Sequence, residues 1–91
     1  MVLTKKAVAG TMESSDVYVE MIPADELTVE VQTVAAQFEP VIRDTTLAVL
    51  NRYRVTGAAV RLVDRGALDC VIRARVEMAL ERAGIVRSNE V

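Results

Sequence analysis

The sequence predicts an α+β fold, a two-layer sandwich in which two helices cover one face of a four-stranded sheet. In residues 16–22 and 27–32, apolar and polar residues alternate with the period of two that is typical of strands, and residues 7–13 are small and apolar. Two later segments, residues 38–53 and 67–83, repeat apolar residues at spacings of three and four, as helices do. A short apolar run at residues 58–63 separates them, so the predicted order is βββαβα.

Three strands are expected before the first helix. The first covers residues 7–13, and Gly10 within it indicates a bulge or a close backbone approach. The second covers residues 16–22. The third covers residues 27–32 and alternates cleanly, which is typical of a strand with one face in water. Its apolar side consists of Leu27, Val29 and Val31.

Each predicted helix carries an apolar face and a local signal at one end. Pro40 suits the first turn of the first helix, where its missing N–H is harmless. Gly84 suits the position just after the second helix. Asp69, Arg73 and Glu77 follow each other at a spacing of four on its solvated side. The expected apolar faces are Phe38, Val41, Ile42, Thr45, Val49 and Tyr53 in the first helix, and Leu68, Val71, Ile72, Val76, Ala79, Leu80 and Ala83 in the second.

Composition limits the classes of function. The 91 residues form a single domain, with residues 1–6 and 87–91 expected to fray. A net charge of −2 gives no attraction to nucleic acid or to anionic lipid. No apolar run approaches the roughly 20 residues of a membrane span, and no signal peptide is evident, so we expect a cytoplasmic protein. The lone Cys70 excludes an internal disulfide, in keeping with a reducing compartment.

The sequence contains no evident catalytic or metal-binding set. Histidine, the commonest general base and metal ligand, is absent. Cys70 follows Asp69 but has no histidine to activate its thiol, so we expect a small core or half-buried residue. Neither catalytic residues nor a metal site are therefore predicted.

Two adjacent serines, Ser14 and Ser15, fall where a tight hairpin would turn between the first two strands. A hydroxyl at a hairpin tip is exposed and far from activating groups, which suits modification by another enzyme. Two-residue hairpin loops favour positive φ angles and residues such as Asn-Gly, so Ser-Ser is locally unfavourable and hints at function. The pattern alone also fits an ordinary polar turn.

Two blocks resemble the acyl carrier subunit of citrate lyase. Residues 9–17 read Ala-Gly-Thr-Met-Glu-Ser-Ser-Asp-Val, and residues 66–75 read Gly-Ala-Leu-Asp-Cys-Val-Ile-Arg-Ala-Arg. The resemblance implies that Ser14 carries a phosphoribosyl-dephospho-CoA arm through a phosphodiester. Ser15 matches a position where that family accepts Gly or Ser, which indicates a conformational role.

The same resemblance implies the partners and the role of the chain. It would be a non-catalytic carrier that moves acetyl and citryl thioesters between the alpha subunit, a CoA-transferase, and the beta subunit, a citryl lyase. The complex would convert citrate to oxaloacetate and acetate. A separate cofactor-attaching transferase would load the arm, so protein made without it would be bare.

Residues around the serine and on the second helix leave alternatives open. Glu13, Ser15 and Asp16 are candidate supporting residues of the turn. Asp16 would accept hydrogen bonds from turn amides, or be read by the attaching enzyme. Asp64 would cap the second helix or end the preceding strand. Four arginines would form a basic face for a phosphate-bearing arm or a partner, or simply a solvated face: Arg65, Arg73, Arg75 and Arg82.

Two other functions remain in view. The carrier of malonate decarboxylase uses the same cofactor, but its serine motif typically reads Gly-Ser-Gly-Asp. Glu13 and the Ala-Leu-Asp-Cys block favour citrate lyase instead. The second alternative is a small α+β interaction module without a covalent group.

Overall fold

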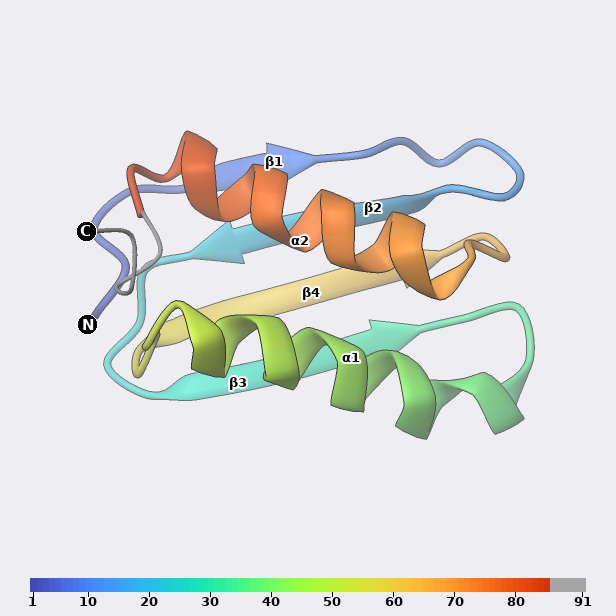
Figure 1. Cartoon of the computed structure of the whole chain (residues 1–91), viewed down its shortest axis with the longest axis horizontal. Helices are drawn as coiled ribbons and strands as arrows, with labels where there is room; N and C mark the ends of the chain where they lie inside the picture. Colours follow the sequence, from blue (N-terminus) through green and yellow to red (C-terminus); the bar gives the residue numbers. More distant parts are fainter. Residues whose placement is uncertain (86–91) are drawn as a thin grey trace.

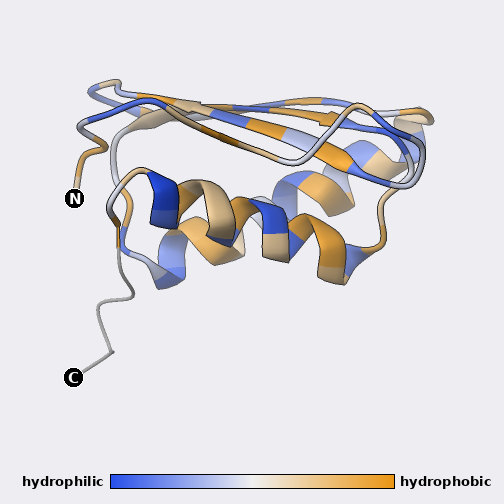
Figure 2. Cartoon of the chain, turned by 90° about the horizontal axis from the view of Figure 1, so that it is seen from above, coloured by the Kyte–Doolittle hydropathy of each residue, from blue (hydrophilic) through white to orange (hydrophobic). Residues whose placement is uncertain are grey.

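A computed structural model describes residues 1–85 and shows one mixed sheet with two helices on one of its faces (Figures 1 and 2). The α+β class and the order βββαβα are confirmed. The elements are β1 (Ala7–Ala9), β2 (Val17–Ile22), β3 (Leu27–Gln32), the 3-10 turn η1 (Ala36–Phe38), α1 (Glu39–Arg52), β4 (Ala58–Asp64) and α2 (Asp69–Arg82).

The strands lie in the order β1-β2-β4-β3. β2 pairs antiparallel with both β1 and β4, whereas β3 runs parallel to β4. The parallel pair follows from its connection, because α1 carries the chain back across the sheet before β4 begins. Buried residues alternate along the central strands and point toward the helices, among them Val17, Val19 and Met21 of β2 and Val60 and Leu62 of β4. The opposite face meets solvent, and there Arg61 pairs with Glu20 at 3.3 Å.

The buried face of α1 differs from the predicted one. Thr46 and Leu50 are fully buried, although the spacing argument missed both. Phe38 and Val41 were expected in the core but are 47% and 59% exposed. Phe38 ends η1 and Val41 lies in the first turn of α1.

The start of α2 corrects two further predictions. Leu68 precedes the helix and is 71% exposed, so it does not belong to the apolar face. Cys70 is exposed and not half-buried. The reason is the helix geometry. Ile72 points into the core, and Cys70, two positions earlier, is turned by about 200° around the helix axis and therefore faces solvent. Gly84 has φ of 84° directly after the final helical cap, which confirms the predicted helix end.

The beginning of the chain is anchored, so the fraying expected for residues 1–6 is wrong for its first residues. Leu3 is only 1% exposed, and its N–H donates to the Gly57 carbonyl at 2.9 Å. The Met1 carbonyl accepts from the Thr56 N–H at 2.7 Å. Residues 87–91, the other segment expected to fray, lie outside the described residues. In residues 1–85, neither helix has the length and apolar character needed to cross a membrane.

Candidate functional site

The connection between β1 and β2 is longer than the expected two-residue turn. Strand β1 ends at Ala9 and not at residue 13, because Gly10 has φ of 84° and leaves the extended conformation. A Cβ at this position would lie 1.8 Å from the Val17 carbonyl oxygen, so the close backbone approach predicted here is confirmed. Residues 10–16 therefore form a broad loop at one end of the sheet (Figure 1).

Ser14 and Ser15 occupy the centre of a β-turn within this loop. The Asp16 N–H donates to the Glu13 carbonyl at 3.1 Å and closes the turn. Of the two serines only Ser15 has positive φ, at 68°, so a turn with positive φ at both positions is ruled out. A positive φ at the third position of a β-turn favours glycine. The conformation of residue 15 therefore suits the position where the family accepts Gly or Ser.

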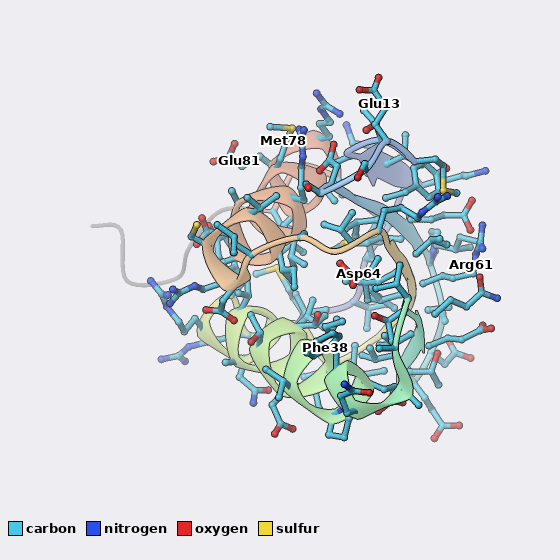
Figure 3. The ribbon with its side chains drawn as sticks, turned by 90° about the vertical axis from the view of Figure 1, so that its right-hand side faces the viewer. Glu13, Phe38, Arg61, Asp64, Met78 and Glu81 are labelled. Carbon is cyan, nitrogen blue, oxygen red and sulfur yellow. The ribbon has the colours of Figure 1, made fainter. Side chains whose placement is uncertain are left out.

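The Ser14 hydroxyl is open to solvent. The residue is exposed, and within residues 1–85 no group hydrogen-bonds to its side chain. The neighbouring Glu13 is also exposed, and its side chain projects away from the molecule (Figure 3). The hydroxyl predicted to carry the prosthetic group is thus accessible to a modifying enzyme.

Asp16 holds the loop together and connects it to α2. Its carboxylate accepts from the Thr11 N–H at 3.1 Å, the Thr11 hydroxyl at 2.8 Å and the Val17 N–H at 2.7 Å. The Arg75 guanidinium adds two bonds, Nε to Oδ1 at 3.1 Å and Nη2 to Oδ2 at 3.0 Å. Hydrogen bonding from Arg75, above all, lowers the Asp16 pKa from 3.8 to about 2. The carboxylate is therefore charged at neutral pH.

This pair connects the two sequence blocks that carry the family resemblance. Asp16 lies in the block at residues 9–17, and Arg75 is the last residue of the block at residues 66–75. They are 59 positions apart, yet form a two-bond contact. We refer to this pair as the Asp16–Arg75 clamp.

Backbone hydrogen bonds tie the serine turn to the loop between β4 and α2. The Ser15 N–H donates to the Arg65 carbonyl at 2.8 Å, and the Arg65 N–H donates to the Asp16 carbonyl at 2.9 Å. These bonds extend the antiparallel β2–β4 pairing beyond the ends of both strands. Residues 14–16 therefore lie next to residues 64–66.

Asp64 ends β4 and does not cap α2, whose N-cap residue is Leu68. Its carboxylate is buried, with 3% of the residue exposed. Oδ1 accepts from the Ala67 N–H at 2.9 Å, which closes a short loop, and Oδ2 accepts from the Thr33 hydroxyl at 2.8 Å. Asp64 thereby fastens the segment that follows β3 to the segment that precedes α2.

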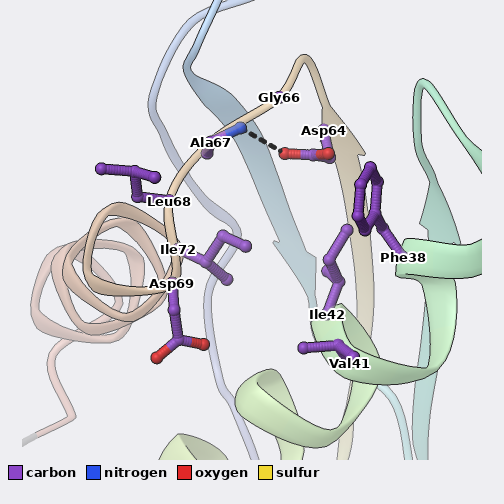
Figure 4. A pocket seen from close by; sticks show the side chains of 9 residues that line it. All are labelled: Phe38, Val41, Ile42, Asp64, Gly66, Ala67, Leu68, Asp69 and Ile72. Atoms are coloured by element: carbon purple, nitrogen blue, oxygen red, sulfur yellow. Dashed lines mark hydrogen bonds between the residues drawn. The ribbon is translucent and has the colours of Figure 1, made fainter.

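A groove of about 330 Å³ opens beside Asp64, between the first turns of α1 and α2 (Figure 4). Phe38, Val41 and Ile42 form one wall, and Ala67 and Ile72 form much of the other. Figure 3 looks onto this end of the molecule, with Asp64 and Phe38 facing the space between the sheet and α1. Asp64 and Gly66 line the groove, and the Arg65 carbonyl between them accepts from the Ser15 N–H of the serine turn.

The four arginines do not form a single basic face. Arg75 binds Asp16, and Arg82 donates to the Val8 carbonyl at 2.9 Å. Arg73 pairs with Asp69 at 3.1 Å on the exposed side of α2, as the spacing of four predicted. Arg65 is exposed beside the serine turn. In the described part of the chain, no cluster of three or more His, Cys, Asp or Glu side chains is arranged to hold a metal ion.

Comparison with known proteins gives the family. A family model described as the malonate decarboxylase delta subunit matches residues 4–83. The citrate lyase acyl carrier protein of Yersinia enterocolitica is 48% identical over 86 residues, which cover 91% of this chain and 89% of that protein. The chain belongs to the citrate lyase acyl carrier protein family. The member from Haemophilus ducreyi is 46% identical over 84 residues, 91% of this chain and 88% of that protein.

The fold of this carrier recurs in a solved complex. A chain in the crystal structure of a Pseudomonas malonate decarboxylase hetero-tetramer in complex with malonate superposes with a TM-score of 0.82. The match covers 92% of the carrier and 89% of that chain, at 22% sequence identity. At that identity the likeness concerns the fold.

Sequence reasoning missed the partners of the serine turn and the groove. Thr11 and Arg75 lie inside the two blocks, but nothing in either block shows that they meet at Asp16. Phe38 and Val41 were assigned to the core because their spacing fits an apolar helix face. Phe38 and Val41 lie opposite the start of α2, and only the three-dimensional structure shows that these two helix ends form a groove.

Proposed function

We propose that this acyl carrier protein bears a phosphoribosyl-dephospho-CoA arm on the Oγ of Ser14. The observation that supports the proposal is the exposed, unbonded hydroxyl at the centre of a turn whose backbone is fastened on both sides. Ser14 is also the serine that matches the attachment position in the resemblance to the family. The role of Glu13, Ser15 and Asp16 as supporting residues belongs to the same proposal.

The residues around Ser14 fit a bulky anionic attachment. The turn projects from the end of the sheet, so an attached group meets solvent and does not displace packed side chains. The negative charge of Asp16, which would repel a phosphodiester, is balanced by Arg75 at 3.0 Å. Arg65 adds an exposed positive charge from the adjacent loop.

The chain itself acts by holding the attachment point still. The Asp16–Arg75 clamp and the Ser15–Arg65 backbone bond fix the turn to α2 and to the loop after β4. The arm supplies a terminal thiol that carries acyl groups as thioesters, so the protein needs no catalytic residue of its own. A tether of this kind raises the local concentration of the acyl group at each partner's active site without tight docking.

The partners follow from this role. We propose that the carrier serves the alpha subunit, a CoA-transferase that exchanges acetyl for citryl, and the beta subunit, a citryl lyase that releases oxaloacetate. A dedicated transferase attaches the arm. The overall reaction of the complex would be citrate to oxaloacetate and acetate.

Intact-mass analysis tests the attachment site. Wild-type protein, Ser14→Ala and Ser15→Ala are each incubated with the cofactor-attaching transferase and the activated cofactor. We expect the wild type and Ser15→Ala to gain the mass of the arm and Ser14→Ala to remain bare. Ser15→Gly serves as a second control, because glycine adopts the φ of 68° without strain. A mass gain in Ser14→Ala would reject the assignment.

Malonate decarboxylase is the second candidate system, favoured by the description of the matching family model. Identities of 48% and 46% to citrate lyase carriers favour citrate. The carrier whose arm bears an acetyl thioester is mixed with the CoA-transferase subunit of either system and its acid, and the acid that replaces the acetyl group, with release of acetate, distinguishes the two systems. Gain of a citryl mass supports citrate lyase, and gain of a malonyl mass with no citryl mass supports the alternative.

A further inference from the structure

The groove between α1 and α2 has the character of a binding site for a slender, mainly apolar group. Phe38, Val41 and Leu68 on its rim are 47%, 59% and 71% exposed, so they leave apolar surface in water. Its volume of about 330 Å³ lies at the lower end of the range of small-molecule sites. Exposed apolar surface gathered in one concave place commonly marks a binding site.

Asp64 gives the groove a chemical preference. Its buried carboxylate accepts from two neutral donors, Ala67 N–H and Thr33 hydroxyl, and the described residues include no ion pair to it. A carboxylate has about four acceptor positions, so about two remain available. Acceptor oxygens of this kind favour an occupant with neutral N–H donors.

The loop that lines one side of the groove also contacts the turn of the proposed attachment site. The Arg65 carbonyl accepts from Ser15 N–H, and the next residue, Gly66, lines the groove. An arm on Ser14 therefore starts from a turn that is hydrogen-bonded to the segment lining the groove. The pantetheine end of such an arm is slender, uncharged and carries two amide N–H donors, which matches the walls and Asp64.

We propose that this groove holds the neutral, acetyl-bearing end of the prosthetic arm while the carrier is away from its partners. The proposal rests on the proposed function, because it requires the arm on Ser14. Ile42 and Ala67 would contact the apolar part of the arm, and Asp64 would accept a hydrogen bond from an amide N–H. The groove walls would cover part of the acyl-bearing end between the two active sites.

The same geometry predicts selection by charge. A citryl thioester keeps two carboxylates, and moving them into a groove lined mainly by apolar side chains is unfavourable, because they would lose hydration without gaining a cationic partner there. The acetyl form would therefore dock, and the citryl form would leave the groove and extend into solvent. The carrier would offer its arm to a lyase subunit in the state that is ready for cleavage.

NMR of the loaded carrier tests this inference. Backbone amide signals of ¹⁵N-labelled protein are compared for the bare, acetyl-loaded and citryl-loaded forms, after intact mass has verified each form. We expect acetyl loading to shift Ile42, Ala67 and Ile72, which line the groove, relative to the bare protein. Citryl loading should return these signals to their positions in the bare protein and leave shifts only around Ser14.

A matched pair of variants locates the contact. Val41→Asp places a carboxylate on the groove rim at an exposed position near a helix start, where an acidic residue is tolerated. Val34→Asp makes the same change at a residue that is 61% exposed and does not line the groove. We expect loss of the acetyl-dependent shifts in Val41→Asp and their retention in Val34→Asp.

The outcomes separate the two proposals. If no mass is added at Ser14, the proposed function fails. If the arm is attached but the groove signals of the acetyl form match those of the bare protein, the function stands and the docking inference is wrong. Groove signals that shift only when a partner subunit is added would likewise overturn the inference, because the groove would then bind that subunit and not the arm.

Discussion

The Asp16–Arg75 clamp offers the sharpest test of the structure. Asp16 and Arg75 side chains are 14% and 29% exposed, and two hydrogen bonds join them. Asp16→Asn and Arg75→Met remove the charges while keeping most of the side-chain volume. A double-mutant cycle with these changes measures the energy of the pair alone.

The expected magnitude follows from two estimates. Lowering of the Asp16 pKa from 3.8 to about 2 corresponds to at most about 2 kcal/mol of stability at neutral pH. Hydrogen bonds to charged groups contribute about 1.5–3 kcal/mol, and solvent around Arg75 reduces this. We therefore expect a coupling energy of about 1–2 kcal/mol at pH 7.

The pH dependence has a defined sign. Because the folded-state pKa of Asp16 is lower than the unfolded one, the stabilisation is fully present above about pH 4–5. It is lost as pH falls from there through about 2, because the carboxylate is protonated first in the unfolded state and, only below about pH 2, mostly in the folded state as well. Asp16→Asn should lack this component, so its stability deficit relative to the wild type should shrink over the same window.

Urea unfolding monitored by circular dichroism, from pH 7 to pH 2.5, provides the measurement. The control cycle is Asp69→Asn with Arg73→Met, an ion pair whose side chains are 52% and 51% exposed. We expect a coupling of about 0.5 kcal/mol or less in that control. A clamp coupling no larger than the control, or a deficit of Asp16→Asn that stays constant to pH 2.5, would refute the reasoning.

Three further predictions concern the scaffold. Gly10→Ala should destabilise the protein by more than about 2 kcal/mol in urea unfolding, because the new Cβ would lie 1.8 Å from the Val17 carbonyl oxygen; a change below about 0.5 kcal/mol would contradict the close approach. Leu62→Ala should cost about 2–5 kcal/mol and Leu68→Ala less than about 0.5, since the former is buried and the latter is 71% exposed; equal losses would contradict the assigned burial. Cys70 in the native protein should react with a thiol reagent nearly as fast as in urea-unfolded protein, and strong native protection would show that the thiol is covered.

Much of the fold was predictable because its strands and helices have strong periodic signals. The alternation of Leu27, Val29 and Val31 gave the bounds of β3 as the structure has them. The buried face of each helix was harder to predict. With a period of 3.6, an apolar stripe shifted by one position fits the sequence almost equally well. In α1 the stripe is centred on Ile42, Thr46, Val49 and Leu50.

The candidate site was predictable only in part. Ser14 was identified from its place between two strands and from the family pattern around it. The length of its loop was not, because the positive φ of Gly10 ends β1 early and local propensity does not reveal that conformation. Cys70 was misjudged because a small apolar residue in a helix fits either face until the core is known.

The sequence by itself determined the order of the elements, the inward faces of the strands and the family, since each depends on residues close together in the chain. Tertiary structure alone decided the strand order, the contact of Asp16 with Arg75 across 59 positions and the groove beside Asp64. The physical reason is that β2 and β3 flank β4 on opposite sides, and this pairing brings the ends of distant segments together. Periodicity records which face of an element is apolar, but not which other element will cover it.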